Sequence, residues 1–370
     1  MQQAKLNNRD ATPIYLDNQA SSSAGMGRGM AQRAGSFSTL SNAILVIMSA
    51  LSNATVLLFL TALTLSGAPR ITTGAPKLEG EMSAGEGPSW DPAGYLYFVG
   101  GNRISRRDLT GKVEIFRAPA GGANGTLIDP ERRLLVCEAL ARRVTRTEKN
   151  GSITVLADRY EGKRFNSPND LAIDSKGRVY FTDPRYGPRD DMEMKVEGVY
   201  RIDAPGKVTR IIAREVDRPN GILVSPGDRY LYVADNNNNN VGGARKLWRF
   251  DLKADGTIDP GSRTLIFDWR TSRGPDGLKM DRRGRLYVAA GLNKANPPAE
   301  TAAPYKGGIY ILSPEGKLLE VVPIPTDEVT NCAFGGADLK TLFVTAGGSL
   351  WSVPVSTPGR ITALGSKRKP

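Results

Sequence analysis

Six oxygen-bearing side chains occupy corresponding positions of a repeated sequence pattern and are the candidates for chemistry. They are Glu86, Asn124, Asn169, Asn220, Asp276 and Asn331. Two carboxylates and four carboxamides offer only oxygen ligands, which hard cations prefer. Carboxylates that are crowded together repel each other unless a cation neutralises them. The set therefore predicts a divalent-cation site, with Ca2+ favoured, Mg2+ second and Zn2+ disfavoured because these positions hold no imidazole or thiolate.

The chain contains no histidine, which restricts the catalysis that it can perform. Ser-His-Asp and Cys-His mechanisms and histidine zinc sites are excluded. Acid–base chemistry must therefore come from carboxylates, lysine, tyrosine or metal-bound water. The two cysteines, Cys137 and Cys332, fall in repeats that are not neighbours. We expect buried thiols rather than a disulfide.

A repeated β-hairpin positions the six candidates. Its clearest copy has a strand at 171–173, a tight turn at 174–177 and a returning strand at 179–181. An aspartate opens the turn and a glycine supplies positive φ. The returning strand carries a marker residue at Tyr97, Leu135, Tyr180, Tyr232, Tyr287 and Phe343. Each candidate side chain stands eleven or twelve residues before its marker.

The spacing of these markers predicts an all-β fold, a six-bladed β-propeller. Successive markers lie 38 to 56 residues apart, and a four-stranded blade takes about 40–50 residues. We expect residues 83–358 to form the propeller, 70–82 to be a linker and 359–370 to be a flexible tail. Because the first strand of each blade lines the central channel, the six side chains would converge near one mouth. Third strands of blades are expected at 198–203, 246–251 and 308–312.

The N-terminal region differs in composition from the repeats. Residues 1–40 are polar and aperiodic, so we expect disorder. Residues 41–69 are apolar and uncharged, which is typical of a signal peptide or a membrane anchor. An exported protein, periplasmic or extracellular, is therefore expected, with possible membrane attachment through this segment. A later start at an internal methionine is the alternative.

The formal net charge of +12 is spread along the chain, without a nucleic-acid motif. We therefore expect no nucleic-acid partner and a modest attraction for anionic small molecules. The asparagine run at 236–240 is expected to be a solvated loop. The long loop at 292–305 is expected to lie over a channel mouth.

Several motifs resemble the senescence marker protein/gluconolactonase/luciferin-regenerating-enzyme family. They are EGP at 86–88, NSPND at 166–170, FTDPRYG at 181–187, RPNG at 218–221, GPDG at 274–277 and TNCAFGG at 330–336. The resemblance covers about residues 83–358. It implies a six-bladed propeller with one axial divalent cation, usually calcium, held by Glu86, Asn220 and Asp276. It implies Asn169 as a further ligand or as a contact to substrate and water.

This resemblance implies calcium-dependent hydrolysis of a sugar lactone. The cation would act as a Lewis acid on the ring carbonyl, and Asp276 would activate water. Asn169 and Asn220 would orient the substrate and stabilise the oxyanion. A carboxylate that binds a cation is a weak base, so metal-bound hydroxide is the alternative base.

The positions of five other residues predict supporting roles. Arg164 precedes the NSPND motif and could hold an anionic substrate, whereas Asn124 and Asn331 could line the channel and contact substrate. Asp183 and Tyr186 are expected to fix the loop that follows their strand. Two other functions stay open: a phosphotriesterase-like hydrolase with an aspartate nucleophile, and a metal-stabilised propeller that acts as a binding module.

Overall fold

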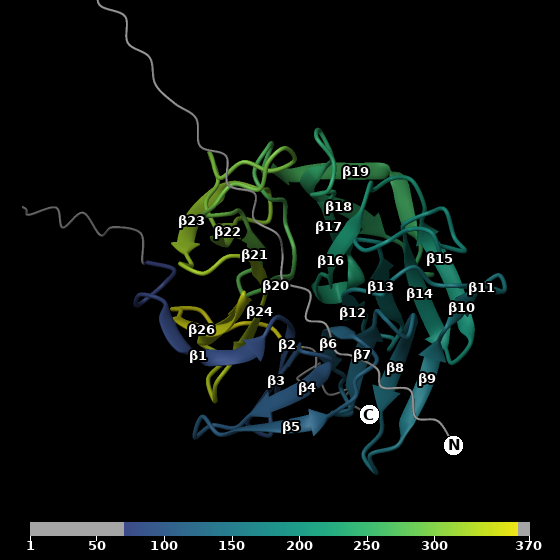
Figure 1. The fold of residues 1–370 in the computed structure, drawn as a ribbon, viewed down its shortest axis with the longest axis horizontal. Coiled ribbons are helices and arrows are strands. Elements are labelled where there is room, and N and C mark those ends of the chain that lie inside the picture. Colours follow the sequence, from purple (N-terminus) through teal and green to yellow (C-terminus); the bar gives the residue numbers. More distant parts are fainter. Residues whose placement is uncertain (1–69, 362–370) are drawn as a thin grey trace, which may run out of the picture. The chain divides into compact units, whose positions relative to one another are not determined.

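The computed structural model describes residues 70–361, which form the predicted six-bladed β-propeller (Figure 1). Each blade is an antiparallel sheet of four strands. The innermost strands surround the axis, and each contacts the innermost strands of the adjacent blades. The predictions for residues 1–40 and 41–69 concern segments outside the described residues. Between residues 70 and 361, no helix is long and apolar enough to cross a membrane.

The strands of the first five blades follow one another along the chain, from the axis outwards. The first blade contains β2 (Glu86–Asp91), β3 (Tyr95–Gly100), β4 (Arg103–Arg107) and β5 (Val113–Arg117). The second contains β6 (Ala123–Ile128), β7 (Leu134–Glu138), β8 (Arg143–Thr147) and β9 (Ile153–Ala157). The third contains β12 (Leu171–Ile173), β13 (Val179–Asp183), β14 (Gly198–Ala204) and β15 (Lys207–Ile212). A short hairpin of β10 (Arg159–Tyr160) and β11 (Lys163–Arg164) precedes it.

The fourth and fifth blades repeat this order. The fourth contains β16 (Pro219–Val224), β17 (Tyr230–Asn236), β18 (Arg245–Leu252) and β19 (Ile258–Asp268), with a 3-10 turn, η1 (Pro226–Asp228), between the first two strands. The fifth contains β20 (Leu278–Met280), β21 (Leu286–Ala290), β22 (Gly308–Leu312) and β23 (Leu318–Pro323). The three third strands predicted from the sequence correspond to β14, β18 and β22. This part of the prediction is confirmed.

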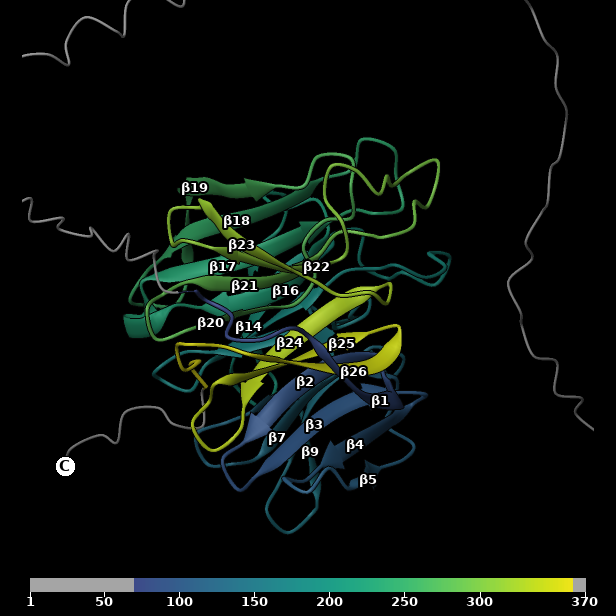
Figure 2. The ribbon, with the colours of Figure 1, turned by 90° about the vertical axis from the view of Figure 1, so that its left-hand side faces the viewer.

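The sixth blade closes the ring with strands from both ends of the propeller. It contains β24 (Val329–Gly335), β25 (Thr341–Ala346), β26 (Gly348–Pro354) and, outermost, β1 (Lys77–Ala84). β1 runs antiparallel beside β26, with Lys77 opposite Ser352 (Figure 2). Residues 77–82 are therefore a strand, and the predicted linker is wrong there. Their sequence, KLEGEM, alternates charged and uncharged residues, but the strand that pairs with them lies at the other end of the propeller.

The propeller also extends into the predicted flexible tail. The backbone nitrogen of Gly359 donates to the carbonyl oxygen of Leu339, and that of Arg360 donates to Met280. The tail prediction is therefore wrong for these two residues, because backbone contacts to two blades hold them. Residues 362–370 lie outside the described part of the chain.

Six apolar clusters, one between each pair of neighbouring blades, form the core. The strand β3 contributes side chains to two of these clusters. Leu96 and Phe98 pack against the sixth blade, whereas Tyr97 and Val99 pack against the second. Successive side chains of a strand point to opposite faces, so a strand that is buried on both faces is apolar at consecutive positions.

The hairpin turns have the predicted chemistry. The Oδ1 atom of Asp174 accepts hydrogen bonds from the backbone nitrogens of Lys176 at 2.9 Å and Arg178 at 3.0 Å. Gly177 has a φ of 82°, which favours glycine. This local geometry sets the register between the first two strands of the blade. It thereby also fixes the position of Asn169, two residues before β12.

Both cysteines are buried and unpaired, as predicted. Cys137 lies in β7 and Cys332 in β24. Burial raises the pKa of the Cys332 thiol to about 12. This thiol is therefore neutral at physiological pH and behaves as a small apolar side chain.

Candidate metal-binding active site

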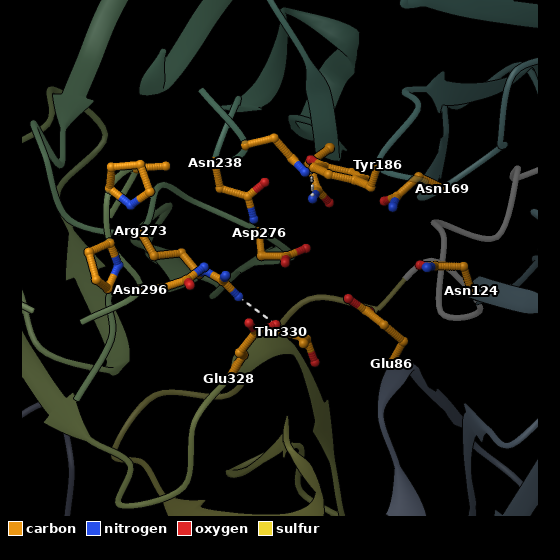
Figure 3. A pocket seen from close by; sticks show the side chains of 15 residues that line it. Glu86, Asn124, Asn169, Tyr186, Asn238, Arg273, Asp276, Asn296, Glu328 and Thr330 are labelled. Carbon is orange, nitrogen blue, oxygen red and sulfur yellow. Dashed lines mark hydrogen bonds and ion pairs between the residues drawn. The ribbon is translucent and has the colours of Figure 1, made fainter. Parts of the chain in front are cut away.

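A cavity of about 490 Å³ opens at the axis, where the first strands of the blades begin (Figure 3). Five of the six predicted oxygen-bearing side chains line it: Glu86, Asn124, Asn169, Asn220 and Asp276. Each stands at the first or second position of the first strand of its own blade or two residues before that strand. Because the hairpins share one register, equivalent positions converge at the same end of the ring.

Asn331, the sixth candidate, does not line this cavity. Its side chain is buried, and its Nδ2 atom donates to Oε2 of Glu86 at 3.2 Å. Asn331 therefore holds a cavity residue in place, contrary to the prediction that it contacts substrate. Its backbone follows the repeat, but its amide is turned towards the neighbouring blade.

Arg164 lies outside the cavity, contrary to the prediction that it binds substrate. It belongs to the exposed hairpin of β10 and β11, and its side chain pairs with Glu193. The chain turns inward only at Phe165, which is fully buried between the second and third blades. Proximity to the NSPND motif in sequence therefore does not bring Arg164 to the axis.

Glu86 and Asp276 are two of the three carboxylates that line the cavity, and the third is Glu328 (Figure 3). Burial, with a smaller contribution from the charge of Asp170, raises the pKa of Glu86 to about 7 against opposing hydrogen bonds. Burial and the charge of Glu86 raise the pKa of Asp276 well above its ordinary value. Both groups are costly to ionise without a nearby positive charge, which a bound cation would supply.

The amide of Asn220 leaves a buried oxygen free for a cation. Its Nδ2 atom donates to the hydroxyl of Tyr186 at 2.8 Å, and that hydroxyl donates to the carbonyl of Asn236 at 3.1 Å. Oδ1 of Asn220, like Oδ1 of Asn124, is buried and has no hydrogen-bond partner in the described part of the chain. An unsatisfied buried acceptor costs about 1–3 kcal/mol, which coordination would offset.

The donor set therefore fits a hard divalent cation. Glu86, Asn220 and Asp276 would hold it, with Asn169 beside them in the same cavity. Within residues 70–361, no group of three or more His, Cys, Asp or Glu side chains is placed to hold a metal. The site consequently depends on amide oxygens as much as on carboxylates. This composition suits calcium or magnesium better than zinc.

Tyr186 contributes more to the site than was predicted from the sequence. It was expected to fix a loop, yet it lines the cavity and orients Asn220. Burial and the charge of Asp276 raise the pKa of its hydroxyl well above the ordinary value. It therefore acts as a neutral hydrogen-bonding group. Asp183 was expected to fix the loop that follows β13. Its carboxylate instead accepts hydrogen bonds from the backbone nitrogens of Asn166 and Ser167 at 2.8 and 2.7 Å, so it fixes the segment that precedes β12.

Arg273 is a cavity residue that sequence reasoning missed. Its Nε and Nη2 atoms each lie 2.8 Å from the buried carboxylate of Glu300, and its Nη1 atom lies 2.5 Å from Glu328 (Figure 3). The side chain of Glu328 is 53% exposed. Arg273 stands three residues before Asp276 in the sequence, but both of its partners come from distant segments. Because of this separation, no local sequence pattern predicts that Arg273 pairs with Glu300 and Glu328.

Two loops form the polar rim of the cavity. Asn238 and Asn239 line it, so the asparagine run is not simply a solvated loop as predicted. Residues 296–299 also line it, which agrees with the expected position of the 292–305 loop. Arg245 joins the two loops by donating to the carbonyls of Gly243 and Ala299, each at 2.6 Å.

The fold and the cavity define a six-bladed propeller with an oxygen-lined axial site. The chain belongs to the SMP-30/Gluconolactonase/LRE-like family, whose sequence model matches residues 84–348. The family predicted from the sequence motifs is therefore confirmed.

Individual relatives agree with this membership. A gluconolactonase from Zymomonas mobilis is 30% identical over 319 residues, which cover 78% of this chain and 83% of that protein. Regucalcin from Sus scrofa is 29% identical over 229 residues, covering 59% and 70%. A solved gluconolactonase structure from Xanthomonas campestris is 29% identical and superimposes with a TM-score of 0.65, covering 77% of this chain and 91% of that one.

Proposed function

We propose that this protein is a divalent-cation-dependent lactonase that hydrolyses a sugar lactone of the gluconolactone type, with calcium as its cation. One observation carries the proposal: Glu86, Asn220 and Asp276 line one axial cavity, and the side-chain oxygen of Asn220 has no hydrogen-bond donor among residues 70–361. The relatives that are named gluconolactonases support the choice of a lactone as substrate.

The side chains of the cavity can divide the chemistry of lactone hydrolysis. When bound, the cation supplies a Lewis acid for the ring carbonyl. Asp276 takes a proton from the water that attacks the carbonyl carbon, and the ring C–O bond then breaks. The proton passes to the ring oxygen as it leaves, so that a hydroxy acid is formed. General base catalysis of this kind contributes about 10²–10⁴-fold.

The remaining polar groups orient the substrate. Asn169 can donate from its amide to the oxygen that gains negative charge. Asn220 is less suited to that role than the sequence suggested, because its amide nitrogen is engaged by Tyr186. The ion pair of Arg273 and Glu328, together with the rim amides, offers donors and acceptors for the hydroxyl groups of a sugar ring.

Hydrolysis of glucono-1,5-lactone by the purified protein tests the proposal. Activity should be lost with EDTA and restored by calcium, and Asp276→Asn should reduce kcat at least about 100-fold. Arg164→Met is the matched control, because Arg164 lies outside the cavity, and it should retain activity. Turnover that persists in EDTA, or a near-wild-type rate for Asp276→Asn, would contradict the proposal.

The same assays separate the two other candidate functions. Hydrolysis of an organophosphate without hydrolysis of any lactone would favour the phosphotriesterase-like enzyme. A calcium-dependent rise in melting temperature without turnover of lactones or esters would favour a binding module.

A further inference from the structure

Arg273 is the only basic side chain among the described residues that line the cavity. It is buried, and two of its nitrogens are held from behind: Nε and Nη2 each lie 2.8 Å from the carboxylate of Glu300, which is buried as well. Nδ2 of Asn296, in the rim loop, donates to the same carboxylate at 3.0 Å. These contacts give the guanidinium a fixed place in the wall of the cavity.

The third guanidinium nitrogen, Nη1, is occupied by Glu328. It lies 2.5 Å from Oε2 of this residue, which precedes β24 (Figure 3). The two partners of Arg273 differ, because Glu300 is buried in the wall whereas Glu328 lines the cavity and is 53% exposed. A guanidinium is well suited to bind a carboxylate or a phosphate. Glu328 therefore takes the position in which an anionic group of a ligand would otherwise bind.

Most of the other polar groups at the rim are uncharged. Asn238, Asn239 and Asn296 line the same cavity, and carboxamides both donate and accept hydrogen bonds, as the hydroxyl groups of a sugar require. An anionic substituent near Arg273 would meet no unpaired basic side chain among the described residues of the cavity. It would instead lie close to the carboxylate of Glu328, and like charges brought together oppose binding.

We propose that Glu328 is a specificity-determining residue that restricts the site to uncharged lactones and rejects lactones that carry an anionic group such as a phosphate. This inference rests on the proposed lactonase function and names the class of substrate within it. Glu328 acts in two ways, because its carboxylate occupies Nη1 of Arg273 and its charge repels an anion at the same place. The net charge of +12 of the whole chain does not counter this local effect.

The kinetic test compares glucono-1,5-lactone with its 6-phosphate, using the purified protein in calcium. The wild type should prefer the uncharged lactone by at least about tenfold in kcat/KM. In Glu328→Gln this preference should fall by at least about tenfold, because a phosphate can displace the neutral amide from Arg273. Glu328→Asp keeps the charge and should retain the preference. Glu193→Gln is the matched control, since Glu193 pairs with Arg164 outside the cavity, and it should keep the wild-type ratio.

A binding test needs no turnover. Isothermal titration in EDTA uses 1,5-anhydroglucitol 6-phosphate, a sugar ring without a lactone carbonyl, and EDTA prevents the phosphate from binding to a cation. Glu328→Gln should bind this ligand at least about tenfold more tightly than the wild type does. Unphosphorylated 1,5-anhydroglucitol should gain no affinity. Glu328→Ala should behave like Glu328→Gln and takes its place in both tests if that variant does not fold.

The inference is overturned if the wild type hydrolyses the phosphorylated lactone as well as the uncharged one, or if Glu328→Gln keeps the wild-type preference. A preference that is lost equally in Glu328→Asp and Glu328→Gln also overturns it, because shape and not charge would then decide. If no lactone is hydrolysed at all, the proposed function fails. Tighter binding of the phosphorylated ring by Glu328→Gln would then still support the role of Glu328, whereas equal binding would overturn it.

Discussion

The side-chain nitrogen of Asn220 donates a hydrogen bond to the hydroxyl of Tyr186 at 2.8 Å, and this contact decides which end of the amide faces the cavity. The hydroxyl uses its own proton for the carbonyl of Asn236 at 3.1 Å, so its oxygen can only accept from Asn220. The Oδ1 atom of Asn220 is thereby left without a donor in the described part of the chain. A tyrosine after β13 thus leaves an amide oxygen of the next blade free to serve as the proposed cation ligand.

Tyr186→Phe should weaken calcium binding. Without the hydroxyl, the amide of Asn220 can rotate and is no longer held with its oxygen towards the cation. One hydrogen bond contributes about 1 kcal/mol, which corresponds to about fivefold in Kd. Isothermal titration measures this change. Tyr230→Phe is the matched control, because the hydroxyl of Tyr230 accepts a hydrogen bond from the exposed Arg229 at 3.3 Å and does not line the cavity. An equal Kd in all three proteins would disprove the role of Tyr186.

The cation-free protein should become less stable as the pH rises from about 4.5 to above 7. Burial raises the pKa of Glu86 from 4.5 to about 7. A carboxyl group whose pKa is higher in the folded chain stabilises the fold below its unfolded pKa, and this contribution is lost as the pH rises through the folded value. The loss is on the order of 3 kcal/mol. Thermal melting in EDTA at pH 5 and pH 8 measures it.

Calcium should therefore raise the melting temperature more at pH 8 than at pH 5. At the lower pH, protons compete with the cation for Glu86, whereas at the higher pH the cation relieves the repulsion between carboxylates. Glu86→Gln is the control, since it keeps the shape of the side chain without its charge. The pH dependence in EDTA should be smaller in this variant, and an unchanged dependence would assign the effect to other groups.

Glu328→Gln should raise KM for a sugar lactone with little effect on folding. The carboxylate of Glu328 is 53% exposed and lies against Arg273 at the cavity. Replacing it removes a charged acceptor for a substrate hydroxyl, which is worth about 1.5–3 kcal/mol, or about tenfold or more in KM. Steady-state kinetics measure the change, with Arg164→Met as a control that should keep the wild-type KM. If KM changed in Arg164→Met but not in Glu328→Gln, Arg164 would contact the substrate and Glu328 would not.

Removal of β1 should destabilise the propeller strongly. A chain that begins at residue 83 leaves the edge of β26 unpaired and loses the ion pair between Glu79 and Arg107 at 2.8 Å. The melting temperature should fall by about 10 °C or more, or the protein should aggregate. A chain that begins at residue 70 keeps β1 and is the control. Equal melting temperatures for the two chains would show that β1 does not contribute to ring closure.

Much of the fold could be predicted because each blade repeats the same local chemistry. The turn at Asp174 to Gly177 fixes the register between two strands within a few residues. Strands such as β3 are apolar at consecutive positions because both of their faces are buried, and this pattern can be read within a single blade. This register also placed Glu86 and Asp276 at the axis. The strand β1 escaped prediction because its partner β26 lies at the other end of the propeller.

The six repeats, with an oxygen-bearing side chain at the same position of each, follow from local sequence, because hairpin turns and strands depend on neighbouring residues. The closed ring, in contrast, is what lets Asn331 support Glu86 from 245 positions away and Arg164 pair with Glu193 outside the cavity. It also lets Arg273 meet Glu328 at the cavity. These contacts join residues from different blades and loops, so they exist only once the ring has closed and no local pattern encodes them.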